Sequence, residues 1–329
     1  MTQETRLPDT MKAVMLTGYG GPEMLKAGEL PLPAMAPHNE VLIEVKAAGV
    51  NPFEAKLRRG WLAGLFPLDM PHVLGTDVAG VVVKKGFDVS ELDVGDRVWG
   101  LLDAMRQGSY AGYVAAPSYL VRRMPANLSF AEAAAVPMPG CTAWHGLVNL
   151  AGLKAGDRVL VQAASGGVGT FAVQIAKARG AWVAATCSTA NCGWVRDLGA
   201  DLVIDYTAED FRETLSDIDI VLDVIGGDVV LKSYEVLKPG GTLLVVLRGD
   251  KVELEAREAM QKKHGVTTRE VVFAAQPEIL DLLRPMFEDG SLKVPIEATM
   301  KLEQAAEAHA MIDKGHRKGK LVLTTGEDA

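Results

Sequence analysis

The residues best suited to chemistry are the glycines of the segment AASGGVG, residues 163–169. An apolar run at 158–164 predicts a buried strand, and from Gly169 to Gly180 the apolar residues take helical spacing. A glycine turn between a strand and a helix lets the backbone approach a diphosphate, and the start of the helix offers free N–H groups. The candidate residues are Ser165, Gly166, Gly167, Val168 and Gly169. The alternative is a turn of the same shape that binds no nucleotide.

The end of the next expected strand, 181–188, indicates which nicotinamide nucleotide would bind. NAD-specific folds place Asp or Glu about 20 residues after the glycines, where it binds the ribose 2′-OH. Here the chain has no carboxylate and offers Ser188, Thr189 and Asn191 instead. Small hydroxyl side chains such as those of Ser188 and Thr189 can surround a 2′-phosphate, and no carboxylate repels its charge. The sequence therefore favours NADPH, with Arg196 as a candidate additional cation.

Composition and charge limit the class of protein. The chain has 329 residues, enough for about two domains, and its formal net charge of −8 argues against nucleic-acid and anionic-membrane binding. Its three cysteines, Cys141, Cys187 and Cys192, are too few for a disulfide framework and suit a reducing compartment. The first ten residues lack an apolar signal-peptide core, and no apolar stretch is long enough to span a bilayer. We therefore expect a cytoplasmic protein that acts on a small molecule.

The expected elements divide the chain into three parts. Residues 1–127 show short strands between glycine and proline turns, which predicts a β-barrel-like domain. Residues 128–276 alternate strand and helix, which predicts βαβ units and a doubly wound parallel sheet. We expect residues 277–329 to return to the first domain. The predicted class is α/β, with a nucleotide-binding domain inserted into a β-rich one.

Eight phrases of the chain resemble, in the same order, those of the medium-chain dehydrogenase/reductase superfamily, in its zinc-free quinone oxidoreductase branch. They are GYGGPEML (18–25), AAGVNPFEAKLRRG (47–60), PHVLGTDVAGVV (71–82), VGDRVWG (94–100), AAAVPMPGCTAWHGL (133–147), AASGGVG (163–169), LGADLVIDY (198–206) and GHRKGKLVL (315–323). The resemblance implies a GroES-like β-barrel domain, a Rossmann domain, dependence on NAD(P)H and an active site in the cleft between the domains.

The resemblance also assigns residues near the two ends of the cofactor. Asn51 and Thr142 match residues that approach the nicotinamide, and Asn51 is also expected to cap the helix at 52–60. Tyr206 matches a residue near the adenosine phosphate, with an aromatic at the end of a strand as the alternative. Lys320 either closes over the cofactor or begins the last strand. The carboxyl ends of two further strands lie where ligands bind in such sheets. The residues there are Ile225, Gly226, Leu247 and Arg248.

No metal is expected. Zinc-dependent relatives need cysteine, histidine and acidic ligands. At the positions of their first two ligand motifs this chain has Gly-Val-Asn, ending at Asn51, and Gly-Thr-Asp, ending at Asp77. Cys141 lies near the third ligand's phrase, but one thiol cannot hold zinc.

Without a metal, the expected substrates are those that accept hydride readily, namely quinones and α,β-unsaturated carbonyls. Asn51 is the expected catalytic residue beside the nicotinamide. The proton is expected from water or from Tyr110 or Tyr113 on a loop facing the cleft, and packing is the alternative role of both tyrosines. Residues 61–70 are expected to line the substrate pocket.

Two alternative functions remain open, and the chain is also expected to form an oligomer. An enoyl-thioester or alkenal double-bond reductase is one alternative, and an NADPH-binding protein with little turnover is the other. The resemblance implies a homodimer joined through an edge strand near residues 271–273.

Overall fold

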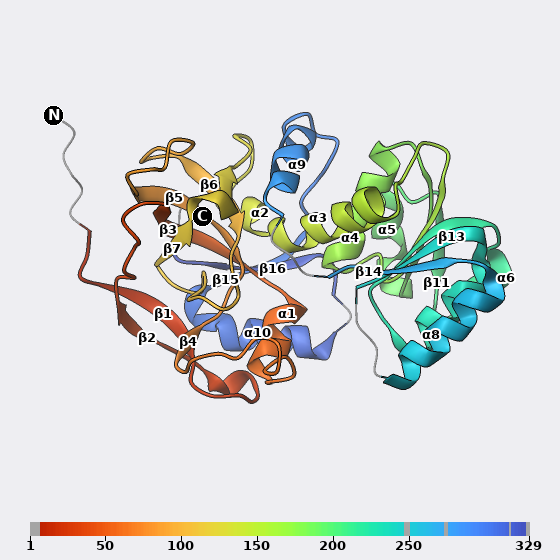
Figure 1. The fold of residues 1–329 in the computed structure, drawn as a ribbon, viewed down its shortest axis with the longest axis horizontal. Coiled ribbons are helices and arrows are strands. Elements are labelled where there is room, and N and C mark those ends of the chain that lie inside the picture. Colours follow the sequence, from red (N-terminus) through yellow and green to blue (C-terminus); the bar gives the residue numbers. More distant parts are fainter. Residues whose placement is uncertain (1–6, 247–250, 273–275, 316, 327–329) are drawn as a thin grey trace.

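The computed structural model of the protein describes residues 7–246, 251–272, 276–315 and 317–326. These residues form two lobes side by side along the longest axis (Figure 1). One lobe consists mainly of antiparallel strands, and the other is a parallel sheet with helices. Within these ranges, no helix combines the length and the apolar character needed to cross a membrane.

The second lobe holds a six-stranded parallel sheet with the order β11-β10-β9-β12-β13-β14. Counted from β9, this is the 3-2-1-4-5-6 order of doubly wound dinucleotide-binding folds. Both faces of the sheet are buried, since Val159 and Val161 face one core and Leu160 faces another. The strands are β9 Arg158–Val161, β10 Trp182–Cys187, β11 Leu202–Asp205, β12 Ile218–Asp223, β13 Leu237–Val245 and β14 Thr267–Glu270.

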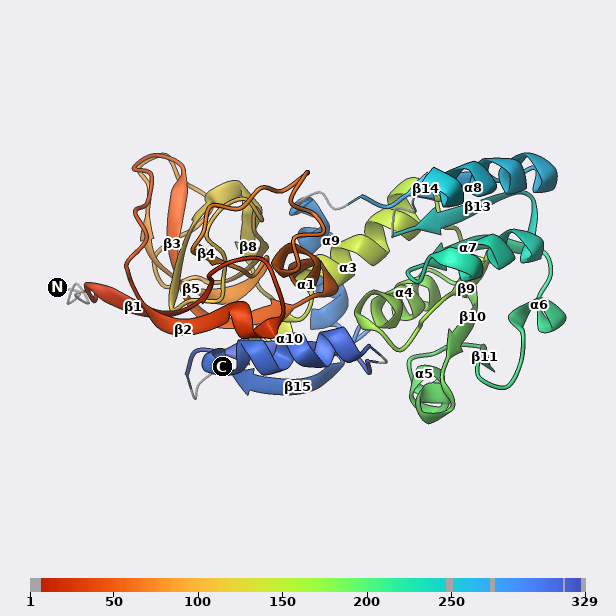
Figure 2. The ribbon, with the colours of Figure 1, turned by 90° about the horizontal axis from the view of Figure 1, so that it is seen from below.

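Helices cover both faces of this sheet. Phe171 of α4 belongs to the core on one face, and Val230 of α7 belongs to the core on the other. Figure 2 shows α8 alongside β13 and β14. The sequence pattern does not predict α8, because its polar residues form helix readily but carry no clear apolar stripe. The helices are α4 Gly167–Ala178, α5 Cys192–Asp197, α6 Phe211–Thr214, α7 Gly227–Ser233 and α8 Lys251–His264.

The first lobe contains a seven-stranded and a three-stranded sheet. The larger runs β15-β16-β3-β5-β6-β8, with β7 also paired to β3, and the smaller runs β2-β1-β4. The strand β16 pairs with β3, so the end of the chain lies in this lobe. The domain boundaries after residues 127 and 276 stay a prediction. The strands are β1 Thr10–Leu16, β2 Leu25–Pro31, β3 Glu40–Val50, β4 His72–Val73, β5 Asp77–Lys85, β6 Arg97–Leu101, β7 Tyr113–Pro117, β8 Val121–Arg123, β15 Ile296–Lys301 and β16 Lys320–Thr324.

The remaining helices lie in the first lobe or between the lobes. A capping box begins α2, with Ser129 Oγ accepting from the Glu132 N–H at 3.2 Å. The helices are α1 Pro52–Arg58, α2 Phe130–Ala134, α3 Pro137–Trp144, α9 Glu278–Glu288 and α10 Ala305–Lys314, and α3 continues as a π-helix, His145–Leu150. Short 3₁₀ turns are Pro22–Met24, Ser118–Leu120, Thr189–Asn191, Tyr234–Val236 and Leu302–Gln304.

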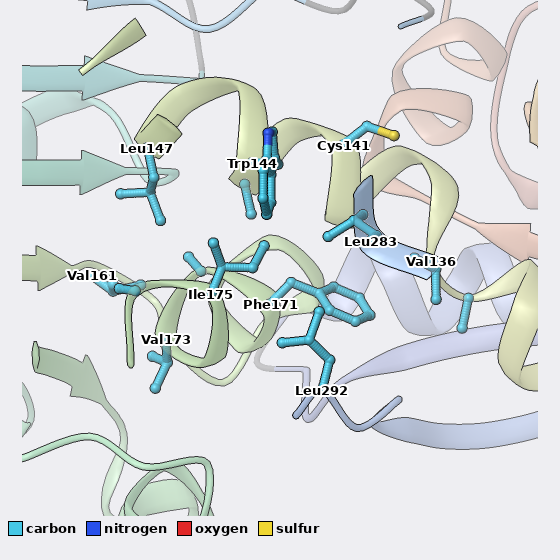
Figure 3. Close-up of a cluster of buried hydrophobic side chains, with 14 of the residues drawn as sticks. Val136, Cys141, Trp144, Leu147, Val161, Phe171, Val173, Ile175, Leu283 and Leu292 are labelled. Atoms are coloured by element: carbon cyan, nitrogen blue, oxygen red, sulfur yellow. The ribbon is translucent and has the colours of Figure 1, made fainter. Parts of the chain in front are cut away.

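A continuous apolar core joins the two lobes (Figure 3). Phe287 of α9 packs edge-on against Trp99 of β6, with ring centroids 5.9 Å apart. It also packs against Phe171 of α4 at 6.3 Å. One side chain therefore contacts an aromatic residue from each lobe, which limits how the lobes can move relative to each other.

Within the first lobe, a buried polar cluster connects α1 and α10. Arg58 is fully buried and donates to His309 Nδ1 at 3.2 Å and to Asp313 Oδ2 at 2.6 Å. Because Arg58 donates to Nδ1, the imidazole is neutral and carries its proton on Nε2, 3.2 Å from the Tyr110 hydroxyl. Burial, together with the Arg58 charge, lowers the pKa of His309 to about 3.

This cluster predicts a loss of stability in acid. The folded state binds fewer protons at His309 than the unfolded state, whose histidine titrates near 6.5. The contribution of His309 to the free energy of unfolding is therefore complete above pH 6.5. Below pH 6.5 it falls by about 1.4 kcal/mol per pH unit. In urea unfolding, the wild type should have a higher free energy of unfolding than His309→Gln at pH 7. This difference should be about 2 kcal/mol smaller at pH 5. An equal gap at both pH values would contradict the assignment.

Candidate active site

The glycine turn predicted to bind a diphosphate lies between β9 and α4. Gly166 is the N-cap residue and α4 begins at Gly167. A Cβ on Gly169 would lie 2.4 Å from the Ala163 carbonyl oxygen, so only glycine lets α4 pack this closely on the turn. A Cβ on Gly166 would meet the same oxygen at an ordinary 3.4 Å. Gly169 is therefore needed for packing, whereas Gly166 leaves the surface of the turn open to a ligand.

A cavity of about 930 Å³ lies beside this turn. It brings together many of the residues predicted to bind the cofactor, namely Ser165, Gly166, Ser188, Asn191, Tyr206 and Ile225. Arg317 and Lys232 line it as well and were not predicted. Of the other cofactor candidates, Leu247 lies outside the described residues, as does Arg248.

Asn191 connects the two walls of this cavity. Its Nδ2 donates to Ser165 Oγ on the glycine turn at 3.2 Å and to Ser188 Oγ at the end of β10 at 3.3 Å. Thr189 turns its hydroxyl to Asp205 Oδ2, 2.5 Å away, and is not among the lining residues. Two of the three predicted polar residues therefore face the cavity, and the third is bound to a carboxylate on β11.

The turn after β12 forms another part of the wall. Asp223 is fully buried, and its Oδ1 accepts from the N–H groups of Ile225 at 2.9 Å and Gly226 at 2.7 Å. Gly226 has φ +83°, a conformation that strongly favours glycine. The carboxylate thus fixes the backbone that places Ile225 at the cavity.

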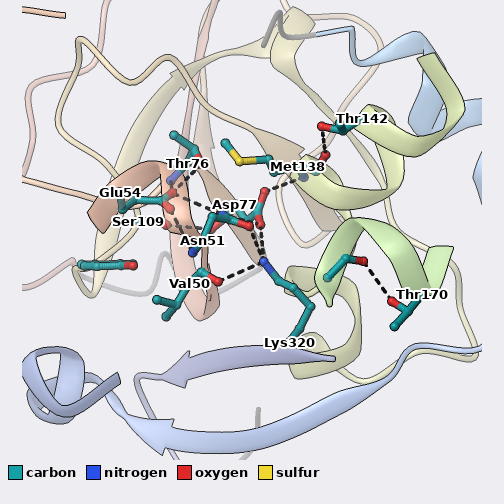
Figure 4. A network of polar contacts seen from close by, with 12 residues as sticks. Val50, Asn51, Glu54, Thr76, Asp77, Ser109, Met138, Thr142, Thr170 and Lys320 are labelled. Atoms are coloured by element: carbon teal, nitrogen blue, oxygen red, sulfur yellow. Dashed lines mark hydrogen bonds and ion pairs between the residues drawn. The ribbon is translucent and has the colours of Figure 1, made fainter. Parts of the chain in front are cut away.

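A buried polar network lies where β3 leads into α1 (Figure 4). Asn51 is 3% exposed, and Glu54 and Asp77 are fully buried. Asn51 Nδ2 donates to Asp77 Oδ2 at 3.0 Å and to Glu54 Oε1 at 3.3 Å. Lys320 Nζ donates to Asn51 Oδ1 and lies 3.4 Å from Asp77 Oδ2. The amide of Asn51 is therefore fixed, with its oxygen toward an ammonium and its nitrogen toward two carboxylates.

Lys320 also contacts the glycine turn. A Cβ on Gly167 would lie 3.1 Å from Lys320 Cδ, so the stem of the lysine packs on the start of α4. The neighbouring Gly319 N–H donates to the Ser165 carbonyl at 2.8 Å. Lys320 begins β16, and its ammonium is directed to Asn51 and to the Val50 carbonyl at 3.1 Å. It therefore links the turn to the Asn51 network.

The charges of this network offset one another only in part. Burial raises the pKa of Asp77, and the charge of Lys320 opposes that rise. Burial also raises the pKa of Glu54, and the charge of Asp77 raises it further. One ammonium thus stabilises two buried carboxyl groups, which makes the network sensitive to loss of Lys320.

The network extends to α3. The Met138 N–H donates to Asp77 Oδ1 at 2.7 Å, and Thr142 Oγ1 donates to the Met138 carbonyl at 2.7 Å. Thr142, predicted beside the nicotinamide, therefore lies one helical turn from a residue bound to Asp77.

Comparison with known proteins identifies the family. Residues 37–137 match the alcohol dehydrogenase GroES-like domain, and residues 198–323 match a zinc-binding dehydrogenase domain. The chain is 34% identical to human (Homo sapiens) quinone oxidoreductase, covering 95% of this chain and 97% of the relative. It belongs to the medium-chain dehydrogenase/reductase superfamily, in the quinone-oxidoreductase-like branch. The predicted fold class, a GroES-like domain with a Rossmann sheet, is confirmed.

Other relatives in this superfamily support the same branch. The mitochondrial NAD(P)H oxidoreductase RTN4IP1 of Danio rerio is 33% identical, with 97% of this chain and 92% of the relative covered. The chloroplastic NADPH-dependent alkenal/one oxidoreductase of Arabidopsis thaliana is 36% identical, with 98% and 82% covered. The structure of the quinone oxidoreductase from Coxiella burnetii matches with a TM-score of 0.87 and 33% identity, covering 96% of this chain and 100% of that one. The chain is an oxidoreductase of a family that uses NAD(P)H.

The predicted placement of two tyrosines beside the cleft of this dehydrogenase fold is wrong. Tyr110 is fully buried, with its hydroxyl 3.2 Å from His309 Nε2, and it packs edge-on against that ring. Tyr113 lies in β7 and lines a separate hollow with Met11 and Val73. The Tyr110 hydroxyl is engaged with His309, and Tyr113 lines a hollow other than the cavity beside the glycine turn, so both side chains have the packing role that was the alternative.

One of the matching domain models is described as a zinc-binding dehydrogenase, whereas the sequence predicts that this chain binds no metal. Among the residues that the structure describes, no group of three or more His, Cys, Asp or Glu side chains could hold a metal ion. Cys141 is buried, which raises the pKa of its thiol. Independence from zinc stays a prediction, and Asp77, at a ligand position of the zinc enzymes, is bound here to Lys320 and Asn51.

Proposed function

We propose that the chain transfers a hydride from NADPH to quinones or to other α,β-unsaturated carbonyl compounds without a catalytic metal. The observation that carries the proposal is that Ser165 and Gly166 line a cavity of about 930 Å³, while Lys320 links the same turn to the Asn51 network. A cofactor held on the turn would extend along this link toward Asn51. The relatives named as quinone and alkenal/one oxidoreductases support this substrate class.

NADPH fits the residues of the cavity. Ser188 and Asn191 offer polar groups at the end of β10, and no carboxylate stands there to bind a ribose 2′-OH as in NAD-specific folds. Two cations and three carboxylates line the cavity as well, namely Lys232, Arg317, Glu209, Asp210 and Glu213. Lys232 lies 4.0 Å from Asp210 and Arg317 is paired with Glu297, so a 2′-phosphate would compete with carboxylates for both cations. Because no carboxylate stands at the end of β10, we propose NADPH as the preferred cofactor.

The cofactor supplies the hydride, and the residues of the chain position it. Gly166, Gly167, Val168 and Gly169 at the start of α4 would bind the diphosphate through backbone N–H groups. Asn51 Nδ2 is bound to two carboxylates and Asn51 Oδ1 accepts from Lys320 Nζ, so the nicotinamide amide would donate to the second lone pair of Oδ1. With both tyrosines turned away, we propose water as the source of the proton.

An apolar loop, residues 61–70, suggests bulky apolar substrates. Phe66 packs edge-on against Phe53 of α1, the helix that Asn51 begins, with ring centroids 5.5 Å apart. Trp61 is 66% exposed, so it is available to a ligand. If the loop lines the substrate site, Trp61→Ala and Phe66→Ala should lower kcat/KM for a naphthoquinone more than for a small enone. An unchanged ranking of substrates in both variants would contradict this role.

The proposed function is tested by NADPH consumption with a naphthoquinone and a 2-alkenal in parallel, with NADH as the control cofactor. We expect turnover with the quinone and a lower KM for NADPH than for NADH. Turnover with the alkenal alone would indicate a double-bond reductase instead. Binding of NADPH without turnover of either acceptor would indicate a cofactor-binding protein.

We also propose a homodimer, joined at β14, and a cytoplasmic location. In the described sheet β14 pairs only with β13 and is an edge strand, and the following Val272 is 65% exposed. The expected strand at 271–273 is displaced, because β14 ends at Glu270, and Phe273 lies outside the described residues. Val272→Lys should then shift the solution mass from dimer toward monomer. A monomeric wild type would contradict the assembly.

The proposed cytoplasmic location rests on the small number of cysteines in the chain. Two of the relatives are named as mitochondrial and chloroplastic.

A further inference from the structure

Two cysteine thiols face each other, and one of them, Cys187, lines the proposed cofactor cavity. Cys187 ends β10 and lines the cavity, and Cys192 begins α5. Their Sγ atoms are 3.5 Å apart. A disulfide has an S–S distance of about 2.05 Å, so the two sulfurs need to approach by only about 1.5 Å.

We propose that Cys187 and Cys192 form a reversible disulfide that weakens binding of the nicotinamide nucleotide. The inference rests on the proposed function only in naming a nicotinamide nucleotide as the ligand of the cavity. The distance between the two thiols and the place of Cys187 in the cavity wall do not depend on the proposed function.

Hydrogen peroxide is the oxidant that we assign. Cys187 is 1% exposed, and burial raises the pKa of its thiol to about 12, whereas Cys192 is partly exposed. The peroxide therefore reacts first at Cys192, where an S–O bond forms, the O–O bond breaks and water leaves, giving a sulfenic acid. The Cys187 sulfur then displaces the sulfenic oxygen as a second water and loses its own proton. Two thiols lose two electrons in total, and one peroxide becomes two waters.

The coupling to the cavity follows from the residues between the two cysteines. Cys192 Sγ donates to the Ser188 carbonyl at 3.5 Å. Asn191, next to Cys192, holds Ser165 and Ser188 together through its Nδ2. Closing the disulfide removes the thiol donor and pulls the start of α5 toward β10. Asn191 then moves relative to the glycine turn, and the cavity changes shape at the point where its walls meet.

The test uses the full chain, reduced and then treated with hydrogen peroxide. Before oxidation, titration under denaturing conditions should find all three thiols of the sequence; afterwards only that of Cys141 should remain. Peptide mass analysis should join Cys187 to Cys192, and dithiothreitol should reverse the change. The Kd for NADPH, followed by its fluorescence, should rise roughly tenfold on oxidation, as expected when one or two hydrogen bonds of the cavity are displaced.

Two variants serve as controls. Cys141 is not among the residues that line the cavity, so Cys141→Ser should keep the peroxide response, whereas Cys192→Ser should abolish it. The inference is overturned if peroxide leaves Cys187 and Cys192 unlinked, or if the linked protein keeps the Kd of the reduced one. If the reduced protein binds no NADPH, the proposed function fails, and the link itself is still decided by mass analysis.

Discussion

Replacing Lys320 by methionine is expected to lower the free energy of unfolding by about 3–5 kcal/mol, the cost of removing one partner of a buried ion pair. Methionine keeps an apolar stem against Gly167 but removes the ammonium that contacts Asn51 Oδ1 and Asp77 Oδ2. Asp77 is then left fully buried without its cation. The measurement is urea unfolding at pH 7, together with kcat and KM for the quinone.

The double variant Lys320→Met/Asp77→Asn is the matched control. Asparagine keeps an oxygen for the Met138 N–H and removes the uncompensated charge, so the double variant should recover more than half of the lost stability. Its kcat should stay low, because Asn51 Oδ1 has lost the ammonium that fixes the amide. A loss in Lys320→Met below about 1 kcal/mol, the value typical of exposed pairs, would show that the pair is not buried in solution.

Gly169→Ala is expected to cost about 3 kcal/mol, the upper part of the usual range for an overpacked site. The added Cβ would lie 2.4 Å from the Ala163 carbonyl oxygen and 2.6 Å from Ala164 Cα, both backbone atoms that cannot rotate away. Thermal unfolding should show a lower Tm, and NADPH binding should weaken because α4 shifts away from the turn.

Gly166→Ala separates packing from ligand binding at the same turn. Its Cβ would meet only the Ala163 oxygen at 3.4 Å, so the Tm should stay within the range of surface substitutions. The Kd for NADPH should nevertheless rise, because the methyl group lies where the diphosphate approaches. An equal fall in Tm for Gly169→Ala and Gly166→Ala would contradict this division of roles.

The parts of the candidate site whose spatial arrangement can be predicted from the sequence are those formed by neighbouring residues. The glycine turn is visible because strand, turn and helix follow one another within a short segment, and Ser188 and Asn191 are found by counting from it. Glu54 could also have been found, because an acidic residue three positions after a cap such as Asn51 is the pattern of a capping box. Its side chain indeed accepts from the Asn51 N–H at 2.9 Å.

The parts that the sequence does not predict depend on distant residues. Tyr110 was expected at the cleft, but its position is determined by His309, which lies 199 residues away in the chain. The partners of Lys320 are 243 and 269 residues away, and no local pattern pairs an ammonium with Asp77 or Asn51. Arg317 reaches the cavity only because β16 pairs with β3 and carries the preceding segment past the glycine turn.

Delivery of a hydride from NADPH to a quinone is the step that defines the proposed function of this chain. The most direct measurement is single-turnover oxidation of bound NADPH by a naphthoquinone, with hydrogen or deuterium at the transferring C4 position. We expect rapid oxidation that slows by a primary isotope effect when deuterium occupies that position. Bound NADPH that persists in the presence of the quinone, or oxidation at the same rate with both isotopes when the chemical step limits the rate, would contradict it.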